Sequence, residues 1–261
     1  LNRTVIVLGF ISFFGDISSE MLYPITPIFL TTTLGASMSF VGFIEGLAEA
    51  IAGLLKTYSG FWSDKIHKRK PFILVGYLLA AIAKPITGTA HAWTTVLFAR
   101  GLDRTGKGIR TAPRDALLAE SVGTELRGAA FGWHRGMDTL GAALGPLLAI
   151  LYLSKNTDLR SIYFWAFIPG MVAVAITMLI PETPSLAPVN TFKWDWRSLS
   201  PTFKHYLLAW GIFSFTNSSD VFLLMRAKES GLSITTTILL YCFYNLIYAL
   251  LSPYLGALSD R

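Results

Sequence analysis

The sequence contains little charge and a single cysteine, and both shortages narrow the choice of protein class. Charged residues make up 15% of the 261 residues, whereas soluble globular domains carry roughly 25%. One cysteine, Cys242, excludes an internal disulfide and a cysteine-based metal cluster within this sequence. Because 52% of the residues are hydrophobic and the mean hydropathy is +0.51, the composition indicates a protein surrounded by lipid.

Motifs of the common enzyme classes are also missing. The segment GLDRTGKG (101–108) begins like a phosphate-binding loop. However, Gly108 stands where Ser or Thr would hold magnesium, and the segment follows an apolar run instead of a strand. The histidines are scattered, and no G-x-S-x-G nucleophile turn occurs. We therefore expect no enzyme activity, no cofactor and no metal site.

Long apolar segments are what the sequence has instead. Segments such as 71–90 and 161–180 reach the roughly 20 residues that a helix needs to cross a bilayer. A helix satisfies its own backbone hydrogen bonds inside hydrocarbon. The alternation of apolar and polar residues that is typical of the strands of a membrane β-barrel is absent. We therefore predict an all-α polytopic membrane protein. The eight expected helices are 4–30, 40–62, 71–90, 93–119, 128–152, 161–180, 204–225 and 234–255.

Basic residues are distributed unevenly among the connections between these helices. The connection at 31–40 contains no charged residue, whereas KIHKRK (65–70) contains four basic ones. Because basic residues mark the cytoplasmic side, we expect the amino terminus in the cytoplasm and the protein in the cell (inner) membrane. The net charge of +6 then reflects topology, so we expect no nucleic-acid partner.

The segment 181–203 differs from the rest in composition. It is rich in proline, serine and threonine and contains two tryptophans. We predict that it is a cytoplasmic linker. It would join a six-helix bundle at 1–180 to the first two helices of a second bundle at 204–261.

Charged residues gather on one face of the predicted helix 93–119. On a helical wheel they fall within an arc of roughly 140°. The residues are Arg100, Asp103, Arg104, Lys107, Arg110, Arg114 and Asp115. For the three that follow Lys107, solvated charges on a cytoplasmic extension of the helix are an equally good interpretation. Arg100 and Arg104 lie deeper in the predicted membrane span and indicate function. Burying an ionisable group in a membrane span costs free energy unless it meets a partner or water.

Other predicted helices carry ionisable residues of their own. These are Asp16, Glu20, Glu45, Glu49, Lys56, His134, Asp138 and Asp220. Several are four residues apart and therefore share a helix face, as Asp16 and Glu20 do. Together with the basic face of helix 93–119, they predict a hydrated polar path through the bundle.

The loop after the second predicted helix reads GFWSDKIHKRK (60–70). It resembles the pattern G-x-x-x-D-[RK]-x-G-x-[RK]-[RK] of the major facilitator superfamily of secondary transporters. The matching residues are Gly60, Asp64, Lys65, Arg69 and Lys70. His67 stands at the position of the second glycine.

The same motif begins again near the end of the sequence. GALSDR (256–261) matches it at Gly256, Asp260 and Arg261. Two related six-helix halves would produce such a repetition.

Two further helices resemble the family. The predicted fifth helix matches the pattern G-x8-G-x3-G-P at Gly132, Gly141, Gly145 and Pro146, and small residues at such spacing let membrane helices pack closely. In the fourth helix, Arg100 resembles the family's arginine, and Asp103 stands where glutamine is usual.

The resemblance implies a bundle of twelve helices, of which this sequence contains about eight. The two halves would rock about a central cavity that helices one, four, seven and ten line. We expect the chain to be a fragment, because it ends after eight helices in the middle of a motif. The family's counterpart of Asp64 contacts the eleventh helix, so we expect these 261 residues alone not to be a competent transporter.

The resemblance also implies roles for individual residues. Cavity lining and substrate binding fall to Asp16, Glu20, Arg100, Asp103, Arg104 and Asp220. Proton coupling falls to Asp16, Glu20, Glu45, Glu49, Asp138 and His134. The gate consists of Gly60, Asp64, Lys65, Arg69, Lys70, Gly256, Asp260 and Arg261, and helix packing depends on Gly132, Gly141, Gly145 and Pro146.

These roles describe a secondary active transporter that moves a small polar or anionic solute by alternating access. We expect proton coupling and export by antiport, because the fifth-helix pattern is associated with antiporters. The partners are then the lipid bilayer, the solute and protons. Three alternatives stay open: a proton symporter that takes up an organic anion, a non-transporting membrane sensor, and a truncated inactive gene product.

Overall fold

The computed structural model describes residues 2–155, 158–181, 196–216, 223, 226–227 and 230–260. Most of these residues are helical, and no strand occurs among them. The all-α class predicted from the sequence is confirmed.

The predicted helix 4–30 is broken near its end. α1 (Arg3–Glu20) stops at a turn, and the short α2 (Thr26–Ile28) and a π-helical turn (Phe29–Thr33) complete the segment. The break coincides with Pro24, whose nitrogen has no hydrogen to donate and whose ring clashes with the preceding helical turn. The prediction of one continuous helix is therefore wrong at this point.

The other predicted helices are present. They are α3 (Met38–Lys65), α4 (Lys70–Gly88), α5 (Trp93–Glu120), α6 (Arg127–Leu153), α7 (Ser161–Thr177), α8 (Pro201–Thr216) and α10 (Ile234–Ser259), with short 3-10 turns at Thr124–Leu126 and Trp196–Ser198. Part of the predicted range 204–225 lies outside the described residues.

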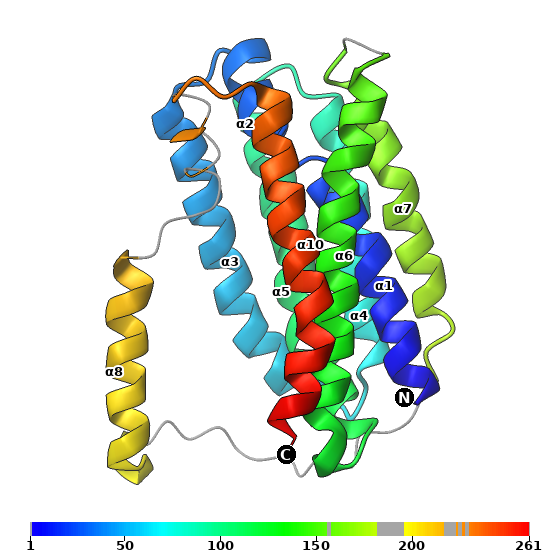
Figure 1. The fold of residues 1–261 in the computed structure, drawn as a ribbon, viewed down its shortest axis with the longest axis vertical. Coiled ribbons are helices and arrows are strands. Elements are labelled where there is room, and N and C mark those ends of the chain that lie inside the picture. Colours follow the sequence, from blue (N-terminus) through cyan, green and yellow to red (C-terminus); the bar gives the residue numbers. More distant parts are fainter. Residues whose placement is uncertain are drawn as a thin grey trace.

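Four helical stretches in the described part of the chain are long and apolar enough to cross a membrane. They are Met38–Lys65, Lys70–Gly88, Thr124–Leu153 and Thr235–Ser259, and α7 is apolar but shorter. α1 and α5 run alongside these helices in the same bundle (Figure 1). A bundle of apolar helices therefore surrounds the charged face of α5.

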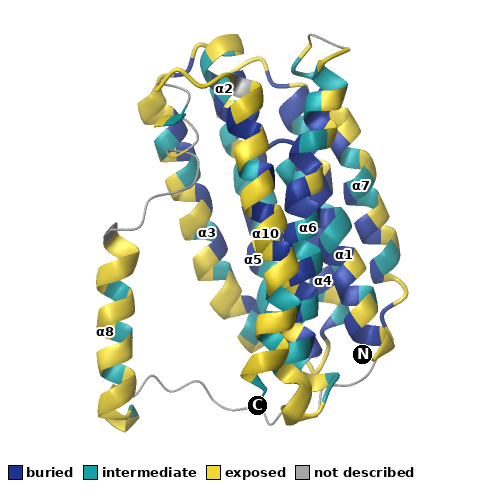
Figure 2. Cartoon of the chain, viewed as in Figure 1, coloured by how far each residue is buried: buried dark blue, intermediate teal, exposed yellow. Residues whose placement is uncertain are grey.

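Five helices, α1, α4, α5, α6 and α7, form the centre of the bundle. α1 packs against α6 and α7, and α4 packs against α5 and α7. α3 packs against the outside of α5, and α10 packs against the outside of α6. Buried residues lie on the faces that these helices turn towards one another, whereas α8 stands apart with mostly exposed side chains (Figure 2).

α6 packs closely on both neighbours through glycine. A Cβ at Gly132 would lie 2.7 Å from the Ser252 carbonyl oxygen of α10, and a Cβ at Gly145 would lie 2.8 Å from the Ile17 carbonyl oxygen of α1. Any larger side chain would therefore push the helices apart. The predicted packing residues Gly132, Gly141, Gly145 and Pro146 are all buried in α6.

Candidate functional site: a charged cavity

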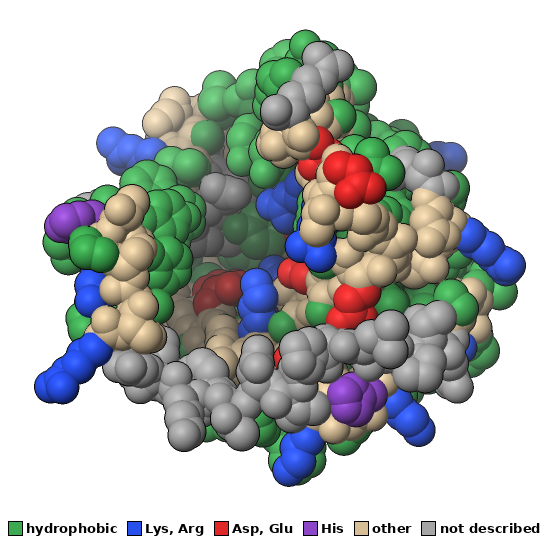
Figure 3. Space-filling model, turned by 90° about the horizontal axis from the view of Figure 1, so that it is seen from below, with side chains coloured by type: hydrophobic (Ala, Val, Ile, Leu, Met, Phe, Trp, Pro, Cys, Tyr) green, Lys and Arg blue, Asp and Glu red, His purple; other side chains and the backbone are tan. Residues whose placement is uncertain are grey.

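A cavity of about 490 Å³ lies between α1, α3, α5, α6 and α10. Figure 3 shows the molecule from the end where α1 begins and α10 ends, with acidic and basic side chains inside a hollow. The lining residues are Asp16, Ser19, Glu20, Tyr23, Glu49, Lys56, Arg100, Asp103, Arg104, Lys107, Arg110, Thr111, Arg114, Asp115, Arg135, Asp138, Thr139, Ala142, Tyr241, Tyr244, Asn245 and Tyr248.

Most of the residues predicted for the cavity or for proton coupling meet in this lining. They are Asp16, Glu20, Glu49, Arg100, Asp103, Arg104 and Asp138. Asp220 lies outside the described residues. Arg110 and Arg114, which could also have been solvated charges on a helix extension, line the cavity and are largely buried, with 7% and 16% of their surface exposed.

The helices that line the cavity differ from those that the resemblance implies. None of the described residues of α8, the seventh predicted helix, lines the cavity. α8 stands apart from the bundle, whereas α10, the eighth, packs on α6 and supplies one wall (Figure 1). The expected role of the seventh helix is therefore taken by α10 in this structure.

Arg100 of α5 is bound by Glu45 of α3. Its Nη2 atom lies 2.7 Å from both carboxylate oxygens of Glu45, and its Nε atom lies 3.0 Å from one of them. Both side chains are more than four-fifths buried. A charge-assisted pair of this kind is strong and directional, so it ties α3 to α5 at the amino-terminal half of the charged face.

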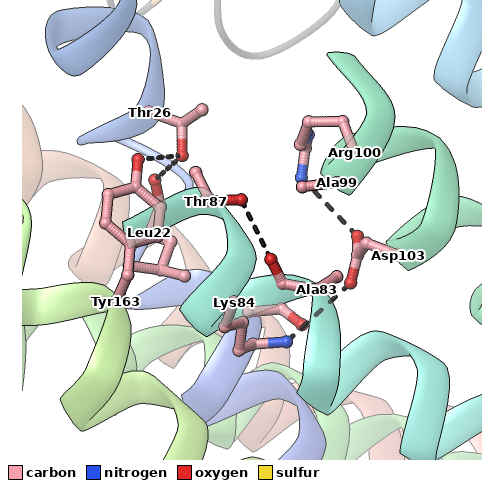
Figure 4. Close-up of a pocket in the computed structure, with 10 residues that line it drawn as sticks. Leu22, Thr26, Ala83, Lys84, Thr87, Ala99, Arg100, Asp103 and Tyr163 are labelled. Carbon is pink, nitrogen blue, oxygen red and sulfur yellow. Dashed lines mark hydrogen bonds and ion pairs between the residues drawn. The ribbon is translucent and has the colours of Figure 1, made fainter. Parts of the chain in front are cut away.

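The sequence analysis missed Lys84, which lies in the last turns of α4. Its Nζ atom donates to the Ala80 carbonyl oxygen at 2.8 Å and lies 3.8 Å from Asp103 (Figure 4). Arg100 and Arg104 approach the other oxygen of Asp103 at 3.6 and 3.7 Å. A lone lysine within the apolar run 71–90 was the signal that could have found it. Asp103 therefore joins α4 to α5 and is shared by three cations.

Asp138 of α6 faces α1. The Ser12 hydroxyl donates to its Oδ1 atom at 2.5 Å, and Arg135 donates to its Oδ2 atom at 3.0 Å. Its carboxyl group also interacts with that of Asp16. Two acidic groups thus meet at the contact between α1 and α6, beside the cavity.

His134 of α6, another predicted coupling residue, has a different position. Only 4% of its surface is exposed, and it is not among the residues that line the cavity. Its Nε2 atom has no hydrogen-bond partner in the described part of the chain. His134 therefore lies in the packed interior next to the site.

Glu20 connects α1 to α10. Its Oε2 atom accepts a hydrogen bond of 2.8 Å from the Tyr241 hydroxyl. The Tyr241 ring in turn stacks on Tyr23 with the ring centres 5.7 Å apart. This side of the cavity is therefore aromatic, whereas the α5 side is basic.

Two of the predicted gate residues of the 60–70 loop, Asp64 and Arg69, form a cluster at the end of the bundle. Arg69 donates to Asp64 and, at 2.6 Å, to the Ser63 hydroxyl, and its Nη2 atom donates to Glu120 at 2.8 Å. Burial alone would lower the pKa of the Arg69 guanidinium, but its bonds to Glu120 and Asp64 outweigh burial and raise that pKa. The cluster joins the ends of α3 and α5 to the start of α4.

The other loop residues take separate positions. Lys70 donates to the Met178 carbonyl oxygen at 3.0 Å, and Lys65 lies over the Trp62 ring at 5.6 Å. His67 has a φ of +52°, a left-handed conformation that glycine adopts without strain. This conformation gives a physical reason for the glycine at this position of the family pattern.

The repeated motif contacts the beginning of α6. The Asp260 carboxylate accepts hydrogen bonds from the backbone N–H groups of Gly128 and Ala129 at 2.6 and 2.7 Å. These N–H groups lie in the first turn of α6, where a negative charge is stabilised by the helix dipole. Gly256 packs directly against Gly128, and Arg261 lies outside the described residues.

A family model described as Major Facilitator Superfamily matches residues 8–261. The chain belongs to the Major Facilitator Superfamily. It is accordingly an integral, multi-pass membrane protein of a transporter family, and it is not an enzyme. The resemblance stated from the motifs is confirmed.

Individual members of the superfamily match to different extents. An uncharacterized MFS-type transporter of Methanocaldococcus jannaschii is 38% identical over 271 residues, which cover 100% of this chain and 67% of that protein. Citrate exporter 1 of Aspergillus niger is 25% identical over 184 residues, which cover 69% of this chain and 34% of that protein. A solved POT family transporter in complex with 5-aminolevulinic acid superposes with a TM-score of 0.63 at 17% identity. That superposition covers 90% of this chain and 49% of the solved one, so this chain spans about half of that transporter.

Proposed function

We propose that the protein carries a small anionic solute across the membrane by alternating access, driven by protons. The observation that carries this proposal is the charged cavity of about 490 Å³ inside a bundle of apolar helices. Ionisable groups at membrane depth mark the paths of solutes and ions. A relative that is named as a citrate exporter supports a small organic anion as the class of solute.

The charges of the cavity favour an anion. Seven of the lining residues are basic and six are acidic. Most of the basic ones lie on α5, which therefore presents a positive wall. Arg100 and Arg104 remain candidates for contact with the solute, which would compete with the carboxylates that hold them in this conformation.

We place proton coupling at Asp16 and Asp138. Two carboxylates side by side repel each other unless a proton or a cation lies between them. Gain or loss of a proton would therefore change how tightly α1 and α6 hold together. Glu20, one turn further along α1 and bonded to α10 through Tyr241, is the second candidate.

The gate would consist of two contacts at the same end of the bundle. One is the cluster of Asp64, Arg69 and Glu120, and the other is the bond from Asp260 to the start of α6. Opening this end breaks both contacts. The basic 65–70 loop supports a cytoplasmic location for this end and for the amino terminus, in a cell (inner) membrane.

The domain organisation follows the same scheme. Residues 1–180 would act as one six-helix half, 181–203 as a cytoplasmic linker, and 204–261 as the beginning of the second half. The repeat of the loop motif at 256–261 supports this division.

Internal pH in proteoliposomes tests the proposal. The full-length protein is reconstituted with a pH-sensitive dye inside, and citrate, succinate or benzenesulfonate is added outside. Antiport with protons makes the interior more alkaline as the anion enters, whereas symport makes it more acidic. We expect antiport, and we expect Asp138→Asn to abolish the response while Asp158→Asn, an exposed residue outside the cavity, keeps it. A pH response to none of the anions would overturn the proposal.

A further inference from the structure

We infer that the cavity prefers a planar aromatic acid. Lys107 and Arg110 of α5 hold its carboxylate, and its ring lies against Tyr241, Tyr244 and Tyr248 of α10. The inference rests on the proposed transport function and specifies the class of its solute.

Lys107 and Arg110 differ from most other cations of the lining, because neither forms an ion pair within the described part of the chain. The four other arginines of the lining each form an ion pair of 2.7 to 3.4 Å: Arg100, Arg104, Arg114 and Arg135. Among the described residues, no carboxylate forms an ion pair with Lys107 or Arg110. Lys56 is also unpaired within that part of the chain, but it stands alone on α3. Because Lys107 and Arg110 are three residues apart, they share one face of α5 and can act on the same anion.

Few of the N–H donors of the Arg110 guanidinium have a hydrogen-bond acceptor in the described part of the chain. The guanidinium carbon lies 4.1 Å from the centre of the Tyr77 ring, and Nη1 reaches the Gly76 carbonyl oxygen only at 3.5 Å. Nε has no hydrogen-bond partner among the residues that the structure describes. A buried donor without a partner is costly, and a guanidinium can present two parallel N–H groups to one carboxylate. The guanidinium makes a single hydrogen bond of 3.5 Å among the described residues, so a carboxylate in the cavity would bond to those of its N–H groups that reach the lining.

Three tyrosines of α10 form a second wall of the cavity. Tyr241, Tyr244 and Tyr248 are three and four residues apart, so their rings share one helix face. Successive ring centres are 6.5 Å apart, and the last two rings are within 5° of parallel. Tyr244 and Tyr248 are 57% and 42% exposed. Tyr244 and Tyr248 therefore present accessible, nearly parallel rings, and Arg135 lies 5.4 Å from the centre of the Tyr248 ring.

The two walls come close to each other at Glu20. Its carboxylate accepts the Tyr241 hydroxyl bond and lies near enough to Lys107 for the two charges to interact. Tyrosine faces attract cations as well as flat rings, but the positive α5 wall disfavours a cationic solute. A solute that satisfies both walls carries a negative group at one end and a flat ring at the other.

Binding of three probes to the purified full-length protein tests this inference by isothermal titration calorimetry. Benzoate has the charge and the aromatic ring, cyclohexanecarboxylate has the charge on a saturated ring, and benzamide has the ring without the charge. We expect benzoate to bind roughly two- to tenfold more tightly than cyclohexanecarboxylate, which is the range that aromatic contacts provide. Benzamide should bind at least about tenfold more weakly than benzoate, because it lacks the charge-assisted bonds.

Single-residue variants test the contribution of each wall to binding separately. Tyr244→Leu should remove the preference for benzoate over cyclohexanecarboxylate, whereas Tyr244→Phe, which keeps the ring, should retain it. Arg110→Gln should weaken both acids by about tenfold or more. Lys155→Gln, at an exposed position beyond the end of α6, is the matched control and should change neither.

The outcomes distinguish this inference from the proposed function. Equal binding of benzoate and cyclohexanecarboxylate, in protein that still changes internal pH with citrate, overturns the aromatic preference alone. Tight benzoate binding that neither Tyr244→Leu nor Arg110→Gln weakens overturns the assigned site. A missing pH response to every anion overturns the transport proposal itself.

Discussion

The charged face of α5 has two halves that differ in what they contact. In its amino-terminal half, Arg100 and Arg104 are held by carboxylates of α3 and by Asp103. In its carboxyl-terminal half, Lys107 and Arg110 form no ion pair with the described carboxylates, whereas Arg114 pairs with Asp115 of the same helix. Similar side chains on one helix face therefore differ: Arg100 and Arg104 fasten helices together, and Lys107 and Arg110 line the cavity without an ion pair. The partners, and not the residue types, make the difference.

The largest effect on stability is expected at Asp103, where three cations meet. In Asp103→Asn, Lys84 loses its ion pair, and Arg100 and Arg104 each lose a nearby negative charge. Because a buried charge without compensation is strongly destabilising, the free energy of unfolding should fall by about 3 kcal/mol or more. Thermal unfolding in detergent measures the change. A midpoint equal to that of the unmodified protein would contradict a structural role for this half.

Glu45→Gln should have the next largest effect. It removes the bidentate bond to Arg100 but leaves Asp103 at 3.6 Å from the same guanidinium. Hydrogen bonds to charged groups contribute about 1.5–3 kcal/mol, so we expect a loss of about 2 kcal/mol in the same unfolding assay. A loss larger than that of Asp103→Asn would mean that the contact with α3, and not the contact with α4, contributes most to stability in the amino-terminal half of the face.

Glu49→Gln should have a small effect, although Glu49 also pairs with an arginine of α5. Its side chain is 62% exposed, and the distance to Arg104 is 3.4 Å. Exposed ion pairs contribute below about 1 kcal/mol, so stability should change by less than this amount. If Glu49→Gln lowers the free energy of unfolding as much as Glu45→Gln does, the solvent exposure of the carboxylate does not determine the strength of an ion pair on this face.

Lys107→Gln should have the smallest effect on stability, within about 0.5 kcal/mol, because no ion pair is lost. The same variant should weaken benzoate binding, which titration calorimetry measures, and Lys107→Arg should preserve binding because it keeps the charge. A destabilised Lys107→Gln protein with unchanged anion affinity would reverse the assignment of the two halves.

Local sequence signals located most of the fold and part of the site. An apolar run marks α4, and a one-sided set of charges marks the face of α5, because both are properties of a single helix. The break near Pro24 was missed because the apolar pattern continues through it. Lys84 was missed because its partner Asp103 lies on another helix, which no local pattern of the run 71–90 indicates. His134, which shares a helix with Asp138, is packed in the interior instead of lining the cavity.

The sequence by itself determined the membrane class, the positions of the helices and the family, because composition, helical period and motif spacing are local properties. Only the tertiary structure decided which charges form ion pairs and which line the cavity without one. The bond between Glu45 and Arg100 joins residues 55 positions apart, and it exists only because α3 packs against α5. Coulomb attraction falls with distance and with exposure to water, so the distances between packed helices assign each charge its role.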